Sequence, residues 1–318
     1  MTASSFDCFN QTSCNHSTAT SPSQETLEYL RISEILSKEV AVVLSLICAL
    51  ISVLGALGNS LILLAVGANT NLRRVPDLFI TSLAISDLSV CLVYLPMVIH
   101  DLNYKFQNDK EFRIFDITKS FFGHISTVAS ATNIFAMTID RVCAIRFPFQ
   151  YIAVLTTEKA LLGISFVWLV SLLFAVLYAS PVLIPRFYAS IYISSLLITT
   201  TIVYIYIFIT AKRQENRIHN VHPRSCNTMT ERKVTKTILT VVGVYALCWM
   251  PLLLLPLILH PSENFVLFKK AFSCVQTLVA CNSAVNPLIY CMRSSKYRRE
   301  FAKVLRIVYC GERIHSVS

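Results

Sequence analysis

The sequence alternates between long apolar segments and short polar ones. Between Lys159 and Arg186, and again between Arg186 and Lys212, the chain contains no Asp, Glu, Lys or Arg, and two later segments are equally free of charge. A helix of about 20 apolar residues crosses the hydrocarbon core of a bilayer, which is about 30 Å thick. Buried helices of soluble proteins rarely stay uncharged over such a length, so these segments predict membrane-spanning helices.

Seven segments satisfy this length requirement. They lie near Val40–Gly67, Leu78–Leu102, Ile117–Ile145, Ala160–Leu183, Phe187–Ala211, Ile238–His260 and Ala271–Met292. The predicted fold is therefore an all-α membrane protein, a seven-transmembrane helix bundle. We interpret residues 1–39 as an extracellular, glycosylated N-terminal tail, residues 40–292 as the transmembrane domain, and residues 293–318 as an interfacial helix with a short cytoplasmic tail.

The distribution of basic residues predicts the orientation. If the N-terminus is extracellular, the inner segments carry most of the 28 Lys and Arg residues, as the positive-inside rule requires. The two N-glycosylation sequons, at Asn10 and Asn15, both fall in the outer tail, which agrees with this orientation. Residues 1–39 contain no apolar core of a cleavable signal peptide, so the first crossing segment is expected to act as the anchor of a multi-pass plasma-membrane protein.

The composition agrees with a membrane location. The chain is 54% hydrophobic and 14% charged, whereas soluble domains are about 25% charged. We therefore attribute the net charge of +10 to contact with membrane lipids, because no basic tract interleaved with aromatic residues indicates a nucleic-acid partner. Most of the 11 cysteines lie in apolar segments, where a thiol behaves as a small hydrophobe. Cys8 and Cys14 could pair with each other or with Cys274, or remain reduced.

The carboxylate of Asp87 lies in the middle of the second segment. A charge at this depth is unfavourable by about 2.5–3.5 kcal/mol, so Asp87 should face the bundle interior and find partners. Candidate partners at a similar depth are Asn59, Ser130, Asn282, Ser283 and Asn286. One carboxylate among neutral oxygens and amides suits a small hard cation such as Na⁺, or a protonation switch. The alternative is a hydrogen-bond network without an ion.

Charged residues at the inner ends of two segments could form the alternative ion pairs of a conformational switch. Asp140 and Arg141 end the third segment, and Glu231 precedes the sixth. Arg141 can pair with Asp140 in its own turn or with Glu231 across the bundle, and a pair that breaks when two helices separate is a two-state element. The alternative is a solvated ion pair, which contributes about 0–1 kcal/mol.

Prolines predict kinks in the sixth and seventh segments. Trp249 lies close to Pro251, and the seventh segment contains Asn286-Pro287-Leu288-Ile289-Tyr290. Proline removes a backbone hydrogen bond and bends a helix, so the packing of Trp249 can couple to a swing of the helix end.

A short amphipathic segment follows the seventh. Tyr297, Phe301, Val304 and Val308 recur at helical spacing with basic residues between them, which predicts a helix in the inner membrane interface. Cys310 at its end is either a palmitoylation site or an unmodified thiol.

Together these motifs resemble the rhodopsin-like (class A) G-protein-coupled receptors over essentially all of the seven segments and the interfacial helix. The matching motifs are Gly58-Asn59, Leu83-Ala84-Ile85-Ser86-Asp87, Asp140-Arg141-Val142, Trp168, Tyr204, Cys248-Trp249-Met250-Pro251 and Asn286-Pro287-Leu288-Ile289-Tyr290, in this order. The resemblance implies an extracellular ligand, outward movement of the sixth helix, docking of a heterotrimeric G protein, and arrestin and a receptor kinase as further partners. The implied allosteric Na⁺ site comprises Asp87, Ser130, Asn282, Ser283 and Asn286. The implied activation switch comprises Arg141, Tyr204 and Tyr290.

The sequence departs from the family pattern on its outer side. Asp116 occupies the position of the cysteine that most members bond to the second outer loop, and Leu196 replaces the usual proline of the fifth helix. The second outer loop is a few residues around Arg186 and contains no cysteine. With the run Cys281-Asn282-Ser283, these features resemble the melanocortin, cannabinoid and lysophospholipid branch.

The resemblance narrows the ligand class by exclusion. Amine receptors of this family carry an Asp at the position of Gly123, and visual pigments carry a Lys at the position of Ala280, so a lipid or peptide is favoured over a monoamine or retinal. Lys119 would meet a ligand head group, or its ammonium would extend to the outer interface. The expected ligand pocket comprises Lys119, Gly123, His124, Thr127, Trp249 and Gln276, for which helix packing is the alternative role.

Three other functions have less support. A transporter or channel needs a polar pathway across the bundle and often two similar halves, and Asp87 alone is little support for such a pathway. A light sensor of this kind would need a lysine in the seventh helix to bind retinal, and this sequence has none there. An enzyme is not expected, because no nucleophile–base pair or metal-ligand spacing stands out. No cofactor is expected apart from an allosteric Na⁺ ion.

Overall fold

The structure is a computed structural model of the chain. It describes residues 35–72, 74–104, 108–147, 150–151, 155–179, 187–219, 226–259 and 264–310. The chain separates into two compact units, Met1–Arg31 and Ile32–Ser318, and the described residues all belong to the second. Within these residues the regular secondary structure is helical throughout.

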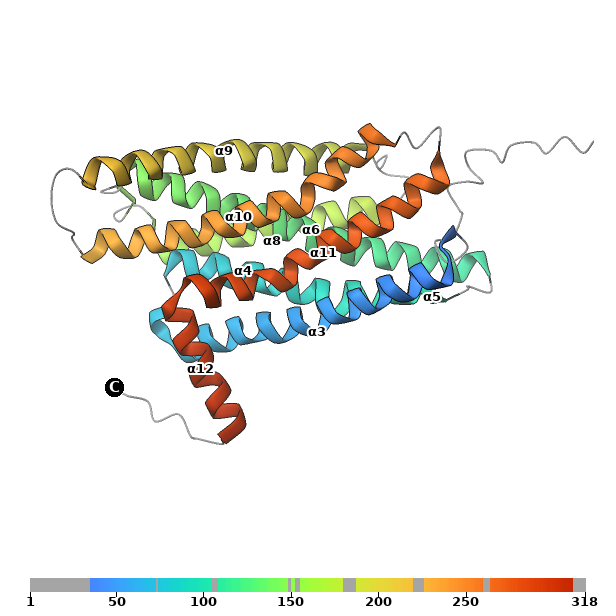
Figure 1. The fold of residues 1–318 in the computed structure, drawn as a ribbon, viewed down its shortest axis with the longest axis horizontal. Helices are drawn as coiled ribbons and strands as arrows, with labels where there is room; N and C mark the ends of the chain where they lie inside the picture. Colours follow the sequence, from blue (N-terminus) through green and yellow to red (C-terminus); the bar gives the residue numbers. More distant parts are fainter. Residues whose placement is uncertain are drawn as a thin grey trace, which may run out of the picture. The chain divides into compact units, whose positions relative to one another are not determined.

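Each of the seven predicted segments coincides with a helical element. The first is α3 (Lys38–Ala68), followed by the short turn η1 (Thr70–Leu72), and the second consists of α4 (Val75–Ser89), η2 (Val90–Tyr94) and α5 (Leu95–Asn103). The others are α6 (Asp109–Arg146), α8 (Thr157–Ala179), α9 (Phe187–His219), α10 (Cys226–Ile258) and α11 (Phe265–Arg293), and α12 (Ser295–Cys310) is the predicted interfacial helix. In Figure 1, α12 turns away from the direction of α11.

Length and hydropathy allow most of these helices to cross a membrane. Over the described residues, six helices are long and apolar enough to do so, and α9 contains a shorter apolar stretch, Ser194–Thr210. The exposed side chains agree with a lipid environment, because Leu46, Leu57 and Leu162 are 66%, 61% and 70% exposed. Lipid is as apolar as leucine, so such exposure is unfavourable in water but not in a bilayer.

The helices extend beyond the predicted apolar segments. α6 begins at Asp109 rather than near Ile117, and the Asn108 side chain caps it by accepting a hydrogen bond from the Glu111 N–H at 2.7 Å. α10 likewise begins at Cys226, well before its apolar part. Hydrophobicity marks the part of a helix that lies in lipid, whereas the backbone hydrogen bonds continue the helix into the aqueous region.

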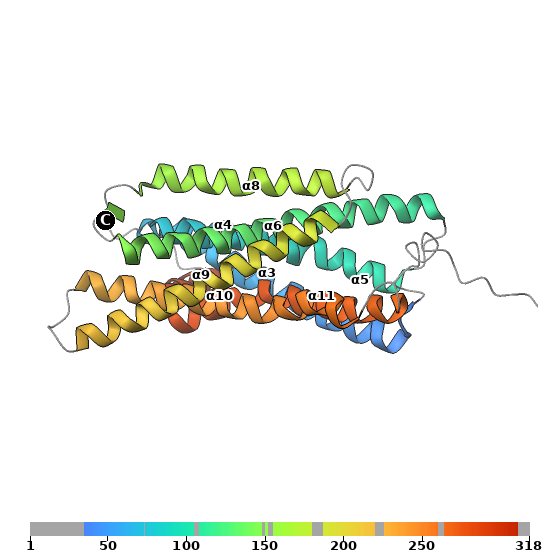
Figure 2. The ribbon, with the colours of Figure 1, turned by 90° about the horizontal axis from the view of Figure 1, so that it is seen from above.

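The central helix of the bundle is α6. It contacts α4, α8, α9 and α10, while α3 packs against α4, α5 and α11, and α10 lies beside α11. Figure 2 shows α8 running along the side of the bundle next to α6. A side chain on α6 can therefore connect several of the helices that surround it.

The second transmembrane helix contains a π-helical turn, Val90–Tyr94, which hydrophobicity does not reveal. Here the Leu95 N–H donates to the Val90 carbonyl, five residues back. Pro96 accounts for the turn, because proline has no N–H and its ring would collide with the carbonyl four residues before it. One inserted residue rotates the following side chains by about 100° around the helix axis.

Glycine allows α3 to approach α11 closely. A Cβ atom on Gly58 would lie 2.7 Å from Cβ and 2.8 Å from Cγ of Pro287. The pyrrolidine ring is rigid and cannot move aside as a flexible side chain would. Small residues at such crossings are the usual means by which membrane helices pack.

We expect Gly58→Ala to destabilise the bundle by roughly 1–3 kcal/mol, because the added methyl group overpacks the contact with Pro287. The measurement is the melting temperature of the purified protein in detergent. Gly163→Ala on α8 is the control, because a Cβ there would meet nothing within 4 Å. Equal melting temperatures for the two variants would contradict the close contact.

Candidate functional site

The Asp87 side chain is fully buried at the centre of the bundle. Asn286 on α11 donates a hydrogen bond from Nδ2 to Asp87 Oδ2 at 2.8 Å, and the Ser283 side chain also interacts with the carboxylate. Asn59 on α3 donates from Nδ2 to the Ser283 carbonyl at 2.8 Å. These contacts join α3, α4 and α11. Ser130 and Asn282, the other residues of the predicted sodium site, are buried as well.

Several buried oxygens in this region have no hydrogen-bond partner among the described residues. They are Oδ1 of Asn59, Asp87, Asn282 and Asn286. A buried acceptor without a partner is unfavourable by about 1–3 kcal/mol. Carboxylate and amide oxygens are the ligands that a small hard cation takes, so this set fits Na⁺. A proton on Asp87 could hydrogen-bond only one of the other oxygens.

Three buried side chains near the kinks of α10 and α11 bring hydrogen-bond donors into the interior. Tyr245 and Trp249 are in contact, with ring centroids 5.3 Å apart, and Tyr245 and Tyr290 lie within electrostatic range of Asp87. The polar atoms of all three have no partner within the described part of the chain. A role for Tyr245 was not predicted from the sequence. Its position one turn before Trp249 is the feature of the sequence that could have indicated one. Pro251 and Pro287 both lie inside their helices, as predicted.

Arg141 is held near the C-terminal end of α6 by two side chains. Its Nε and Nη2 atoms donate to Asp140 Oδ2 at 2.9 and 2.6 Å. The Tyr151 hydroxyl accepts from Arg141 Nη2 at 3.1 Å and donates to Asp140 Oδ1 at 2.8 Å. With its side chain 1% exposed, Arg141 is not the solvated pair of the alternative interpretation. Nothing in the residues around Tyr151 indicates this role, and the Glu231 side chain lies outside the described part.

The two tyrosines of the predicted switch lie on different helices. Tyr204 on α9 faces α10, because a Cβ on Gly243 would lie 3.2 Å from its hydroxyl oxygen. Tyr290 on α11 packs against Tyr297 on α12, with ring centroids 5.6 Å apart. Tyr204 therefore links α9 to α10, and Tyr290 links α11 to α12.

Lys119 forms ion pairs in the outer half of the bundle. Its Nζ lies 2.5 Å from Asp101 Oδ2 on α5 and 3.2 Å from Asp116 Oδ1 on its own helix. The Lys119 side chain is 15% exposed, and that of Asp101 is 7% exposed. The ammonium is therefore directed at carboxylates of the protein rather than outward to the membrane interface. The pair with Asp116 lies within α6, whereas the pair with Asp101 joins α6 to α5.

Gly123 and Gln276, two of the predicted pocket residues, meet at Tyr94. A Cβ on Gly123 would lie 2.7 Å from Cε2 of the Tyr94 ring, and Gln276 Nε2 on α11 donates a hydrogen bond to the Tyr94 hydroxyl. Tyr94 was not predicted, because only the π-helical turn brings it to this face. His124 stacks on Tyr178 of α8, with ring centroids 4.5 Å apart.

Comparison with known proteins agrees with this geometry. The family model described as 7 transmembrane receptor (rhodopsin family) matches residues 58–183 and 179–290. The chain belongs to this family. It is a class A, rhodopsin-like G-protein-coupled receptor, a multi-pass membrane protein with seven transmembrane helices, and not an enzyme.

Three similar receptors show how far the likeness extends. The histamine H2 receptor of Cavia porcellus is 26% identical over 303 residues, covering 87% of this chain and 83% of that protein. The adenosine receptor A2b of Gallus gallus is 26% identical over 313 residues, covering 86% and 90%. The human melanocortin receptor 3 is 28% identical over 275 residues, covering 82% and 83%. The names of these relatives cover different ligands, so the likeness does not single out one branch.

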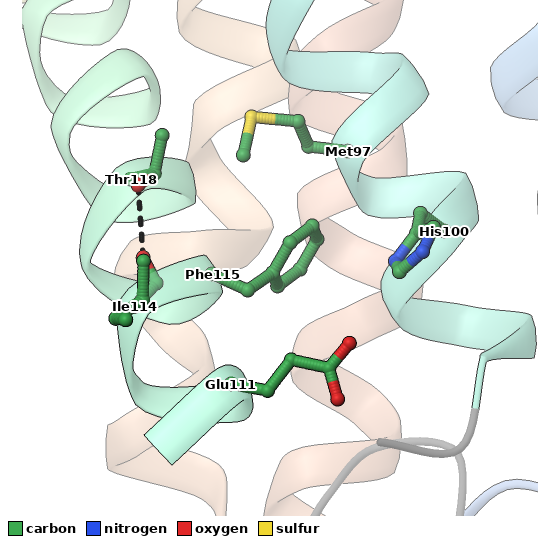
Figure 3. Close-up of a pocket in the computed structure, with 6 residues that line it drawn as sticks. All are labelled: Met97, His100, Glu111, Ile114, Phe115 and Thr118. Carbon is green, nitrogen blue, oxygen red and sulfur yellow. Dashed lines mark hydrogen bonds between the residues drawn. The ribbon is translucent and has the colours of Figure 1, made fainter. Parts of the chain in front are cut away.

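A cavity of about 410 Å³ opens on this receptor between the outer parts of α5 and α6 (Figure 3). Met97 and His100 of α5 face four residues of α6, which are Glu111, Ile114, Phe115 and Thr118. None of the predicted pocket residues lines this cavity. Thr127 is half-buried on α6, and Trp249 belongs to the main core cluster.

The receptor's helix α12 is fixed to the first turn of α4. The Tyr297 hydroxyl donates to Asp77 Oδ1 at 3.0 Å, and Lys296 Nζ lies 3.1 Å from Asp77 Oδ2. Burial, and then the Asp77 carboxylate, raise the pKa of Tyr297 well above that of a free phenol, so its hydroxyl remains a donor. Phe301 and Val304 are buried on the same face, as the amphipathic pattern predicts.

Some predictions concern residues that the structure does not describe. The glycosylation sites Asn10 and Asn15, the cysteines Cys8 and Cys14, and the predicted segment ends Leu183 and His260 lie outside the described residues, as does the side chain of Cys310. Within the described part, the apolar cysteines and Cys274 are free thiols.

We expect Lys119→Met to lower stability and surface expression strongly, because it leaves the Asp101 carboxylate buried without a cation. Removing one partner of such a pair is typically unfavourable by about 3–5 kcal/mol. The measurement is the melting temperature of the purified receptor, alongside surface labelling in cells. The double variant Lys119→Met/Asp101→Asn should recover most of the loss, and a double variant no more stable than the single one would contradict the pairing.

Proposed function

We propose that this receptor lies in the plasma membrane with its N-terminus outside and activates a heterotrimeric G protein when an extracellular ligand binds. The observation that carries the proposal is the ring of Asp140, Arg141 and Tyr151 at the inner end of α6. A buried cation held by a carboxylate and a phenol has two alternative sets of partners, one inside the receptor and one on a docked G protein. This is the requirement for a two-state element.

The mechanism is a population shift. A ligand that binds the state with an open inner face more tightly moves the equilibrium toward that state by its differential affinity. α10 is the element that swings, with Pro251 and the contact between Trp249 and Tyr245 as the pivot. The swing would separate Glu231 on α10 from Arg141 on α6. Tyr204 and Tyr290 would then rearrange against the new position of α10.

Sodium would act on the same equilibrium from the centre of the bundle. The oxygens of Asp87, Asn282 and Asn286 would hold the ion, with Ser130 and Ser283 as further ligands. An ion held by oxygens on α4, α6 and α11 favours the state in which these helices stay close together. It therefore opposes activation, because binding to one state alone stabilises that state.

The ligand we favour is a lipid or a peptide rather than a monoamine bound through α6. The support is Gly123, which places no carboxylate at the position where amine receptors have one. Among partners at the inner face, the basic segment between α9 and α10 would contact the G protein or anionic lipid. Arrestin and a receptor kinase would act on the activated state.

We expect Arg141→Ala to lower ligand-independent and ligand-dependent G-protein activation at least about tenfold per receptor molecule in the membrane. A tenfold change corresponds to about 1.4 kcal/mol. The measurement is nucleotide exchange on purified G proteins in membranes that carry equal amounts of receptor. Arg146→Ala is the control, because Arg146 lies exposed at the end of the same helix. Normal exchange with Arg141→Ala would disprove the assignment of the switch.

We expect NaCl to raise the melting temperature of the receptor relative to choline chloride at equal ionic strength, and Asp87→Asn to abolish the difference. Sodium at ten times its Kd stabilises the bound state by about 1.4 kcal/mol. Ligand affinity should likewise lose its sodium dependence in Asp87→Asn. If the wild type melts at the same temperature in both salts, the sodium site does not exist.

A further inference from the structure

The cavity between α5 and α6 opens away from the interior of the bundle. Ile114 on its wall is 58% exposed, and Glu111 and Thr118 are exposed as well. Lys119, the next residue after Thr118, projects about 100° further around α6, where its side chain is only 15% exposed. The cavity therefore lies on a different face of α6 from Lys119 and from the ligand pocket that the sequence predicts inside the bundle.

Along the membrane normal, the cavity spans the edge of the apolar segment. Glu111 lies in the first turn of α6, which begins at Asp109, whereas Thr118 follows Ile117, where the predicted apolar segment begins. The seven residues of helix from Glu111 to Thr118 rise by about 10 Å. One end of the cavity therefore lies at the aqueous boundary of the membrane, and the other end lies level with lipid chains.

The end level with the lipid chains is apolar. Met97, Ile114 and Phe115 line it, and the Thr118 hydroxyl donates to the Ile114 carbonyl at 2.8 Å, so this hydroxyl is engaged within its own helix (Figure 3). Methionine is flexible and adapts to the shape of what it contacts. This part of the cavity suits a hydrocarbon chain.

The end at the aqueous boundary combines aromatic rings with a carboxylate. The His100 ring contacts Tyr104 and Phe115, with ring centroids 4.6 and 4.9 Å apart. Figure 3 shows the Glu111 carboxylate extending from α6 toward α5. The Tyr104 hydroxyl donates to Glu111 Oε1 at 3.4 Å, and a carboxylate can accept several further contacts. Aromatic faces and a carboxylate are the groups that bind an ammonium ion.

The charge behind this end also favours a cation. Lys119 Nζ lies 5.9 Å from the centroid of the Phe115 ring, but it is paired with both Asp101 and Asp116. Together with Glu111 this makes three carboxylates against one ammonium, so the local charge is negative. An anionic head group would meet repulsion here, whereas a cationic one would be attracted.

Two further basic residues near the start of α6 are directed elsewhere. Lys110 and Arg113 are exposed, and they project about 100° and 160° around the helix from Glu111. Of the six described residues that line the cavity, Glu111 is the only Asp, Glu, Lys or Arg.

We propose that this cavity is a separate binding site of the receptor, which takes from the surrounding lipid an amphiphile with a quaternary ammonium head group. The head group lies against Glu111 and the rings of His100 and Phe115, and the chain runs past Ile114. The volume of about 410 Å³ falls within the range of about 300–1,000 Å³ that is usual for ligand sites. The proposal goes beyond the proposed function, because it involves neither a G protein nor the predicted pocket.

The test uses the full-length receptor in phosphatidylglycerol nanodiscs and two photoreactive probes that differ in one atom. One probe is myristoylcholine with a diazirine in its acyl chain, and the other is the matching 3,3-dimethylbutyl ester, in which carbon replaces the nitrogen and the charge is lost. Mass spectrometry of the labelled peptides locates each probe. We expect myristoylcholine to label residues 111–118 at a mole fraction at least about threefold lower than the neutral ester.

Variants separate the head group from the chain. Glu111→Gln keeps the size of the side chain and should raise the mole fraction of myristoylcholine for half-maximal labelling at least about threefold. Glu39→Gln is the matched control, because Glu39 is an exposed glutamate in the first turn of α3, and it should behave as wild type. Ile114→Trp fills the cavity without touching Glu111 and should abolish the labelling. If Ile114→Trp does not fold, the exposed Glu111→Gln change still decides the test.

Four results would each overturn the proposal. They are equal labelling by the two esters, unchanged labelling of Glu111→Gln, labelling of folded Ile114→Trp as strong as wild type, and competition by free choline at the same concentration as by myristoylcholine. The last result would indicate a site for a free cation rather than for an amphiphile. None of these readouts uses a G protein, so failure of the Arg141 prediction would leave them standing.

Discussion

The need to satisfy polar groups without water governs this molecule. In the hydrocarbon core a donor or acceptor must find its partner inside the protein, which confines the backbone to helices and turns the polar side chains inward. The hydrogen bond from Asn286 to Asp87 is the central case, since it joins α11 to α4 around a fully buried carboxylate. This bond leaves buried oxygens without a partner among the described residues, and these are the oxygens that we propose bind Na⁺.

Most of the fold could be predicted from the sequence because lipid imposes a simple rule of length and charge. Long apolar runs, four of them free of charge, identified all seven segments, and the period of Tyr297 and Phe301 identified α12. The helix ends could not be predicted in this way, since α6 begins at Asp109 through a cap by Asn108 and not through hydrophobicity. The π-helical turn depends on how the backbone accommodates Pro96. The packing of the neighbouring helices determines this, so the turn could not be predicted from the sequence.

The candidate site likewise contains residues that the sequence predicts and residues that it does not. Asn286, which bonds Asp87, was one of five partners that the sequence offered, because a carboxylate in lipid has few alternatives. Tyr151 and Tyr94 could not be predicted, because each acts through geometry that no motif encodes. Tyr151 completes a ring around Arg141 from the segment that follows α6, and Tyr94 reaches Gly123 only after the helix has been rotated. A sequence therefore predicts the residues whose role follows from the cost of burying a charge in lipid. It does not predict the residues whose role depends on how closely two helices approach each other.

The attachment of α12 to Asp77 has a mechanical consequence. Both Lys296 and Tyr297 bind this carboxylate on α4, so α12 is fastened to the second transmembrane helix as well as continuing from the seventh. A bend of α11 at Pro287 would therefore be taken up between Pro287 and Ser294, where the chain leaves α11, and would not carry α12 away. Under the proposed mechanism, α12 would therefore keep its position beside α4 while the bend of α11 and the swing of α10 change the surface offered to a G protein.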